Sequence, residues 1–435
     1  MILAAAVPAL AAESLLERLT DTYLAALRRQ ARPVRQAARP TPRTGNWEDV
    51  RTVLHAHSGL SHDSRGTAEE LAAAAKAAGV RAVFMTEHPT PDRRWWNEGL
   101  RGDIGGVLFV RGAELSSGLL VWRSDGANWT PEMSARDVLT RLDGTAGVSF
   151  IAHPELKTAD ADWDLPAFHG MEIYNTHADA LDNNYEQTLN SLRTNNPLRT
   201  LTLVNTLKKY PREAFAAIFD EQTGVLQRWD RLNVEGQARR RRVIGIAAND
   251  AHSNVGITVV AADTDVEIRD GLDAVVSRTA KSRFPPLLFG DLSRGSVLLS
   301  HRFDPYPISL GYVSTHLLAA AVTEEDLFSA LLAGRAYVAF DWLADPSGFR
   351  FAAETAAGPV EMGGETQLTQ QPRLVAQANM PCVLRLLRNG EELQRVEQGE
   401  LTAPVTQAGV YRLEAWVRLG ETLRPWIYTN PIYVR

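Results

Sequence analysis

The sequence lacks several features that mark common protein classes. It has one cysteine, Cys382, which excludes an intramolecular disulfide framework and a zinc site built from thiolates. No apolar stretch reaches the roughly 20 residues that a helix needs to span a bilayer, so no membrane span is expected. The net charge of −6 provides no basic footprint for a polyanion, which disfavours nucleic-acid binding driven by counterion release. The sequence also has no P-loop, dinucleotide fingerprint or nucleophile elbow.

Six short stretches of the chain end in residues that bind divalent metals. They are His55-Ala-His57, Glu87-His88, Glu114, His153, Asn175-Thr-His177 and Asp250-Ala-His252. Side chains two apart on a strand point to the same face, so His55 and His57 can hold one ion or two adjacent ions. The same holds for Asp250 and His252. For a single histidine, a core or surface role is the ordinary explanation. For all of these residues together, that explanation would require both same-face pairs to be accidental. We therefore predict one assembled metal site.

An apolar, β-branched or aromatic segment precedes each of these stretches and is typical of a buried strand. The segments are residues 53–54, 82–85, 107–110, 148–151, 171–174 and 243–246. Helical patterns lie between several of them, notably residues 67–79, which have a threonine cap, early acids and a terminal glycine. Strands that alternate with helices form a parallel sheet whose functional groups gather at the carboxyl ends of the strands. The pattern predicts an α/β fold with a βα barrel.

The ligand types indicate which metals would bind. Several imidazoles with two or more carboxylates and no thiolate suit zinc, manganese or iron, because the set mixes borderline nitrogen with hard oxygen donors. The candidates also outnumber the roughly four protein ligands that one zinc takes. We therefore expect two or three divalent transition metals that share bridging carboxylates.

Seven separated motifs within residues 50–260 resemble those of the PHP (polymerase and histidinol phosphatase) superfamily, in the same order. They are His55-Ala-His57-Ser58, residues 61–71, Thr86-Glu-His88, Gly112-Ala-Glu114, Ala152-His-Pro154, Glu172-Ile-Tyr-Asn175 and Asn249-Asp-Ala-His-Ser253. The resemblance implies a distorted seven-stranded βα barrel with up to three metal ions in a cleft at the strand ends. The strand-rich tail resembles, more narrowly, the carbaryl hydrolase-like branch of PHP metallohydrolases.

The resemblance also implies a set of metal ligands, position by position. They are His55, His57, His62, His88, Glu114, His153, His177, Asp250 and His252. Many relatives have Asp directly after the Ser of the second motif, where this chain has His62 followed by Asp63, so both residues are candidates. Glu172 is either support for a ligand or an ordinary buried acid.

The expected reaction is hydrolysis of a phosphoester by a metal-activated water, with Asp250 and His252 as catalytic residues. His252 or another histidine of the site would protonate the leaving oxygen. A carbamate, carboxylic ester or amide hydrolase on the same metals is the alternative, and a non-catalytic surface-binding module is the third interpretation. The expected substrate is a small, phosphorylated molecule. The sequence does not define the oligomeric state.

Loops that follow the strands are expected to bind this substrate. The loop at residues 90–96 contains Arg93 and Arg94 together with two tryptophans, and Arg65 and Lys157 also follow ligand positions. Arginine prefers phosphate, and the tryptophan pair favours a ring-bearing leaving group. A solvated turn with its tryptophans packed on the barrel is the alternative for this loop.

The length of 435 residues predicts two domains plus extensions. Residues 1–45 combine an apolar start that resembles a truncated secretory signal, an amphipathic helix at 13–30 and an Arg- and Pro-rich linker, which favours a secreted or periplasmic protein over a cytoplasmic one. Residues 46–334 are expected to form the hydrolase barrel with covering segments, including helices at 273–280 and 324–333. Residues 335–435 contain short strands and the hairpin turn Asn389-Gly390, which predicts a small β-sandwich.

Overall fold

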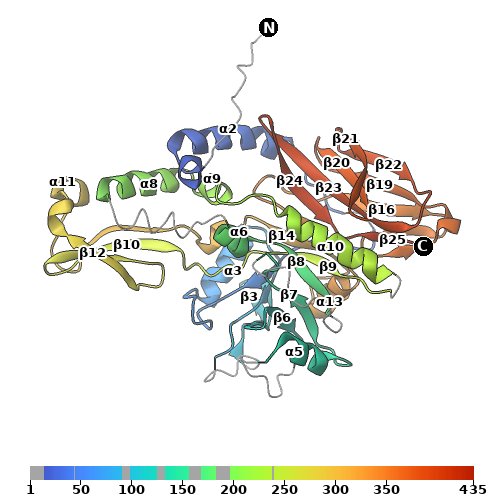
Figure 1. Ribbon diagram of the computed structural model, residues 1–435, viewed down its shortest axis with the longest axis horizontal. Coiled ribbons are helices and arrows are strands. Elements are labelled where there is room, and N and C mark those ends of the chain that lie inside the picture. Colours follow the sequence, from blue (N-terminus) through green and yellow to red (C-terminus); the bar gives the residue numbers. More distant parts are fainter. Residues whose placement is uncertain are drawn as a thin grey trace, which may run out of the picture.

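The fold is mixed α/β, with strands in four sheets (Figure 1). The computed structural model describes residues 14–43, 45–90, 98–124, 133–155, 168–182, 196–237 and 240–435. The apolar start of the chain and three of the predicted substrate-binding residues, Arg93, Arg94 and Lys157, lie outside these ranges. None of the helices in the described part of the chain is long and apolar enough to cross a membrane.

The largest sheet has twelve strands and draws on segments from both ends of the chain. Strand β1 pairs in parallel with β2 and antiparallel with β14, and β15 continues the sheet from β14 to β24. Its strands are β1 (Glu48–Ala56), β2 (Ala82–Met85), β3 (Gly102–Ile104), β4 (Val107–Val110), β14 (Ser314–Ala319), β15 (Ala336–Ala339), β18 (Glu365–Thr366), β20 (Val383–Arg388), β21 (Glu391–Val396), β23 (Gly409–Leu419), β24 (Thr422–Thr429) and β25 (Ile432–Val434).

A five-stranded sheet contains the other strands that were predicted to lead to metal ligands. In order it contains β5 (Gly112–Leu115), β6 (Leu119–Trp122), β7 (Val148–Ile151), β8 (Gly170–Asn175) and β9 (Ile244–Ala248). Strands β7, β8 and β9 are parallel, as the sequence predicts. Strand β6 is antiparallel to both of its neighbours, because Gly118, with a φ of 76°, reverses the chain directly after β5.

The predicted seven-stranded barrel is not confirmed. The hydrogen-bonded ladders leave both of these sheets open. Two single bridges join them, one between Ala56 and Ala251 and one between Glu87 and Ala113. Each bridge lies beside predicted metal ligands, so the bridges hold the ends of β1 and β2 against β9 and β5. The ends of strands from two sheets therefore meet at one place without a closed ladder around them.

Helix α3 (Ala68–Ala77) begins where the sequence predicts a helix start. The Thr67 side chain accepts a hydrogen bond from the Glu70 backbone, and the Glu70 side chain accepts one from the Thr67 backbone, as in a capping box. The amphipathic segment predicted at 13–30 forms two helices, α1 (Leu15–Arg18) and α2 (Asp21–Ala37), because Thr20 caps a new helix start. Helix α2 packs on β23 and α9.

The described part of the chain contains eight further helices. They are α5 (Ala135–Leu142), α6 (Thr176–Asp182), α8 (Pro197–Lys209), α9 (Pro211–Ala216), α10 (Thr223–Gly236), α11 (Pro286–Phe289), α12 (Tyr306–Ser309) and α13 (Glu324–Leu332), with short 3₁₀ turns η2 (Lys281–Arg283) and η3 (Leu368–Gln370). Helix α13 confirms the prediction at 324–333.

A four-stranded sheet extends from one side of the molecule, away from the C-terminal strands (Figure 1). It contains β10 (Gly256–Ala261), β11 (Asp265–Arg269), β12 (Val275–Ala280) and β13 (Val297–Arg302). The helix predicted at 273–280 is wrong, because this segment is strand β12. Asp273, with a φ of 67°, turns the chain, and the β-branched residues after it pair with β11.

The last sheet contains β16 (Arg350–Thr355), β17 (Gly358–Glu361), β19 (Arg373–Gln377) and β22 (Glu400–Pro404). Phe351 and Leu374 of this sheet share one hydrophobic core with Leu384 and Leu413 of the twelve-stranded sheet. The predicted hairpin turn is confirmed between β20 and β21. Asn389 and Gly390 there have φ angles of 55° and 84°, the positive values that a tight two-residue turn requires.

Candidate metal centre

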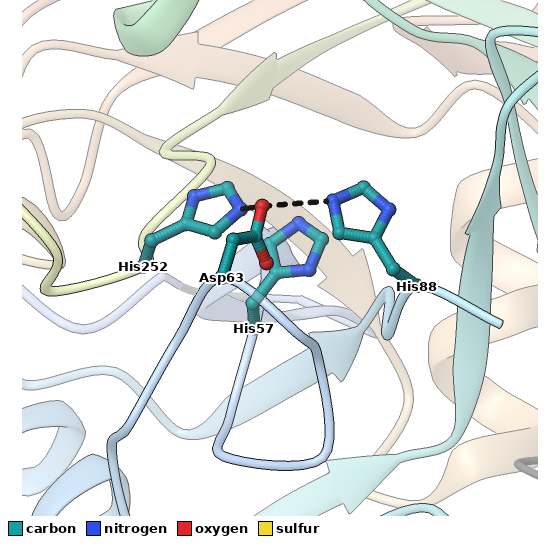
Figure 2. Close-up of side chains that lie close together, drawn as sticks. All are labelled: His57, Asp63, His88 and His252. Carbon is teal, nitrogen blue, oxygen red and sulfur yellow. Dashed lines mark ion pairs between the residues drawn. The ribbon is translucent and has the colours of Figure 1, made fainter. Parts of the chain in front are cut away.

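Eight predicted or alternative ligands form two groups at the place where the sheets meet. His57, Asp63, His88 and His252 make one donor set (Figure 2), and His55, Glu114, His153 and Asp250 make the other. Within each set the ligand atoms lie within 4.8 Å of one another. The residues come from β1, β5 and the segments that follow β1, β2, β7 and β9. Residues far apart in the sequence therefore converge, as strand-end placement predicts.

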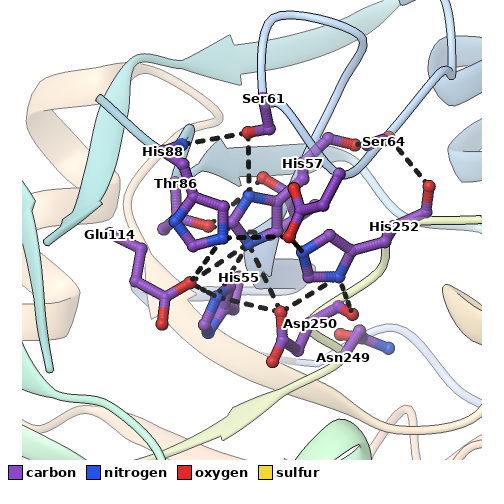
Figure 3. Close-up of polar contacts among 12 residues, drawn as sticks. His55, His57, Ser61, Ser64, Thr86, His88, Glu114, Asn249, Asp250 and His252 are labelled. Carbon is purple, nitrogen blue, oxygen red and sulfur yellow. Dashed lines mark hydrogen bonds and ion pairs between the residues drawn. The ribbon is translucent and has the colours of Figure 1, made fainter. Parts of the chain in front are cut away.

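Two carboxylates lie between the two donor sets (Figure 3). Glu114 Oε2 is 3.0 Å from His55 Nε2 and 3.3 Å from His57 Nε2. Asp250 Oδ1 is 3.2 Å and 3.3 Å from the same two nitrogens. The two Nε2 atoms are themselves 3.0 Å apart. Carboxylates in this position can bridge two adjacent cations.

Hydrogen bonds on the far side of three histidine rings leave their Nε2 atoms free for a metal. His55 Nδ1 donates to Glu172 Oε1 at 2.6 Å, and His252 Nδ1 donates to the backbone oxygen of Asp250 at 2.9 Å. His57 Nδ1 donates to Ser61 Oγ at 3.1 Å. A ring nitrogen that donates keeps its proton, so the other nitrogen is the one that can give a metal its lone pair once it has lost any proton of its own. All three Nε2 atoms belong to the two donor sets.

A buried carboxylate holds the loop that carries this arrangement. Ser61 donates its hydroxyl proton to Glu87 Oε2 at 2.7 Å, which leaves Ser61 Oγ to accept from His57 and from the backbone of His88. Glu87 also accepts from the backbone and hydroxyl of Ser58. Glu87 therefore orders the loop rather than joining either donor set.

Two of the candidate ligands have strained backbones. His153 and Asp250 have φ angles of 45° and 47°, in the left-handed region that residues other than glycine seldom adopt. Such conformations cost of order 1–3 kcal/mol each and persist where the surroundings impose them. Asp250 Oδ2 lies 2.8 Å from His153 Nε2, so the two strained residues meet at the centre.

The electrostatics of the centre are dominated by buried acids and imidazoles. Burial alone lowers the pKa of His153, but the carboxylates of Asp250 and Glu114 raise it to about 9. Burial also lowers the pKa of His252, but the carboxylates of Asp250 and Asp63 outweigh this effect and raise the pKa to about 9. His153 and His252 thus take up protons that balance the carboxylates, whereas burial lowers the pKa of His57. Divalent cations would displace those protons, so metal binding should release protons.

The structure separates some of the sequence-predicted residues from the donor sets. His62 is in neither set, and its ring centroid lies 5.1 Å from that of His88, whereas its neighbour Asp63 is a donor. His177 is also outside both sets, with its ring 5.9 Å from that of His252. The Arg65 guanidinium donates to the backbone oxygen of Leu272 at 2.7 Å, so it tethers a loop.

The donor sets fit divalent cations. Each combines imidazole nitrogens with carboxylate oxygens, which suits zinc, manganese or iron. Asp250 Oδ1 is buried and accepts no hydrogen bond from any residue that the structure describes. A bound cation would satisfy this oxygen. Two cations, one per set, match the number of donors.

The sequence left the role of Glu172 open. In the structure Glu172 accepts hydrogen bonds from His55 and His153 of the second donor set. Its Oε1 accepts from His55 Nδ1, while its Oε2 accepts from the backbone of His153 and from Asn175 Nδ2, both at 2.8 Å. The sequence signals for this role are an acid that alternates with apolar residues along β8 and its place in the motif Glu172-Ile-Tyr-Asn175.

Glu172→Gln should weaken metal binding about 10- to 100-fold. Both glutamate oxygens accept from donors, so the amide NH₂ of glutamine would have to face either His55 or His153 and Asn175. Metal affinity, measured by titration against a competing chelator, checks this result. Glu70→Gln, in the exposed capping box of α3, is the matched control and should leave the affinity unchanged. Equal affinities of the two variants would contradict the role assigned to Glu172.

No protein-family model matches the chain, and no curated protein matches its sequence. One solved structure that aligns with this chain is a two-domain protein from Bacteroides vulgatus that contains a predicted PHP-like metal-dependent phosphoesterase. It is 12% identical to this chain, and the alignment covers 91% of this chain and 98% of that one with a TM-score of 0.36. A likeness this weak does not establish the family or the activity of the chain.

Proposed function

We propose that the protein is a metal-dependent hydrolase of phosphoesters that holds two divalent cations. The observation that carries this proposal is the pair of four-residue donor sets with Glu114 and Asp250 between them. Sites with two adjacent metals are widely used to cleave phosphoesters. The order of the sequence motifs, which resembles that of PHP proteins, supports the same reaction.

In this proposal His55, Glu114, His153 and Asp250 hold one cation, and His57, Asp63, His88 and His252 hold the other. Bound there, the cations would lower the pKa of a water and neutralise charge on the phosphoryl oxygens. The chain itself orients the donors through Glu172 and Ser61, and Asp250 and His252 remain the residues proposed for catalysis. His177, outside both sets with its ring 5.9 Å from that of His252, is a further histidine proposed for proton transfer with the substrate.

Metal content and bond preference together test the proposal. Protein purified without chelator and reloaded with manganese or zinc should contain about two ions per chain. It should hydrolyse p-nitrophenyl phosphate or bis(p-nitrophenyl) phosphate faster than a p-nitrophenyl carbamate, and chelator should abolish the activity. The three substrates share a leaving group, so the comparison reports the bond that is cleaved.

Fewer than one ion per chain would refute the two-cation centre. Faster cleavage of the carbamate would assign the centre to carbamate or carboxylic ester hydrolysis instead. A loaded protein that cleaves none of the three substrates would contradict the proposed reaction and leave the surface-binding interpretation.

A further inference from the structure

A cavity of about 130 Å³ lies beside the metal centre, between the N-terminal helix α1, helices α6, α8, α9 and α12, and the segment after β13. Its wall is mostly apolar and includes Leu15, Leu19, Leu203, Phe215, Phe219 and Ile308. His177 and Asp250 line the same cavity. Asp250 belongs to a donor set, so the cavity adjoins the metal centre at this residue.

The size and wall of the cavity suit a single aromatic ring. Apolar cavities of about 150 Å³ bind benzene. The rings of Phe215 and Phe219 meet edge to face, with centroids 4.9 Å apart and planes at 74°. Aromatic rings prefer such edge-to-face and offset contacts, so a third ring between these walls would be stabilised beyond its area alone.

The charged residues of the described wall already have partners. Arg302 donates to the backbone and hydroxyl of Ser253. Asp304 accepts from the backbones of Asn254 and Val255 at 3.0 Å and 2.9 Å. Burial lowers the pKa of His301 to about 4, which leaves its ring neutral at physiological pH. The cavity therefore has no spare cation for a second phosphate, and a neutral group fits it better.

Besides Asp250 Oδ1, two buried polar atoms of wall residues have no hydrogen-bond partner among the described residues. They are Ser309 Oγ and Asn249 Oδ1. An unsatisfied buried polar atom costs about 1–3 kcal/mol, so native proteins seldom leave one without a reason. Asn249 Nδ2 donates to the backbone oxygen of Ser309 at 2.8 Å, so the two residues form one polar region in a mostly apolar wall.

We propose that this cavity binds a single-ring aromatic leaving group, so that the enzyme prefers aryl phosphoesters to alkyl phosphoesters. The inference rests on the proposed hydrolase function for the reaction, but the ligand class follows from the cavity itself. The ring occupies the space between α1, α8 and α9, while the ester group stays at Asp250.

Binding of phenol tests the cavity separately from the reaction. Phenol should bind the full-length protein, with or without metal, when binding is followed by saturation-transfer NMR. Ala214→Leu, which fills the cavity from α9, should weaken phenol binding about tenfold. Ala216→Leu, a buried position on the same helix away from the cavity wall, should not weaken it. No binding by the parent protein, or equal binding by both variants, would overturn the proposal.

Kinetics provide the second test. The ratio of kcat/KM for phenyl phosphate to that for ethyl phosphate should fall about tenfold in Ala214→Leu. Leu207→Ala, which widens the cavity, should shift the substrate preference toward 1-naphthyl phosphate. This variant still tests the cavity if Ala214→Leu does not fold. Unchanged ratios in both variants would refute the aryl preference while the hydrolase function stands. If phenol binds and Ala214→Leu abolishes its binding, but the protein hydrolyses no ester, the ligand class would stand and the hydrolase function would be refuted.

Discussion

Asp250→Ala should reduce hydrolysis by several orders of magnitude and lower metal occupancy at the same time. Asp250 Oδ1 lies within 3.3 Å of nitrogens of His55, His57 and His252, and its Oδ2 lies 2.8 Å from His153. Its loss removes a carboxylate that belongs to one donor set and lies 3.3 Å from His57 Nε2 of the other. Without the cations the pKa of the attacking water would stay far above neutrality, so little hydroxide would form. Initial rates and elemental analysis on the same preparation measure both effects.

Asp250→Asn keeps this experiment interpretable. The Asp250 backbone has a φ of 47°, which asparagine tolerates and alanine does not favour. The asparagine variant should therefore fold as the parent does and still lose metal and activity, because an amide is a weaker ligand than a carboxylate. Cys382→Ala, a buried position in the C-terminal region, is the control for both properties. Near-parental hydrolysis by Asp250→Asn with metal bound would place the active site elsewhere.

Arg412→Ala should lower the free energy of unfolding by about 3–5 kcal/mol. Arg412 is buried on β23, where its Nε and Nη2 donate to the two oxygens of Asp230 on α10 at 2.6 and 2.8 Å. Its Nη1 donates to Glu414 at 2.6 Å. Removing the guanidinium leaves the buried Asp230 carboxylate without the cation that it pairs with, while Glu414 keeps Arg385 Nη1 at 3.1 Å. Denaturant unfolding followed by circular dichroism measures the loss.

An exposed ion pair supplies the control for this experiment. Lys209 bonds Asp21 at 2.8 Å with both side chains more than half exposed. Lys209→Ala should leave the unfolding midpoint nearly unchanged, because solvent screens such pairs. Equal losses in the two variants would mean that Arg412 does not hold α10 on the C-terminal sheet.

Local signals in the sequence were sufficient where the physical cause is local. The capping residues Thr67 and Glu70 predict the start of α3, and Asn389-Gly390 predicts the turn between β20 and β21. The alternation of His55 and His57 at the end of a buried strand predicts their shared orientation. The mixed α/β class also follows from these patterns. Strand β12 was missed because Val275 to Ala280 is too short for periodicity to separate strand from helix, and pairing with β11 decides it.

The sequence by itself determined which residue types reach the centre, since donors placed at strand ends must gather at one edge. Only the tertiary structure decided how these residues divide between the two donor sets. The loop fixed by Glu87 and Ser61 brings Asp63 rather than His62 among the donors, and Glu172 meets His55 across 117 residues. The separation of the sheets into open ladders, and the placement of Leu15 beside Asp250 in one cavity, also depend on packing between distant segments. Such long-range contacts leave no periodic trace in the sequence, because each side chain is fixed by neighbours that its own segment does not contain.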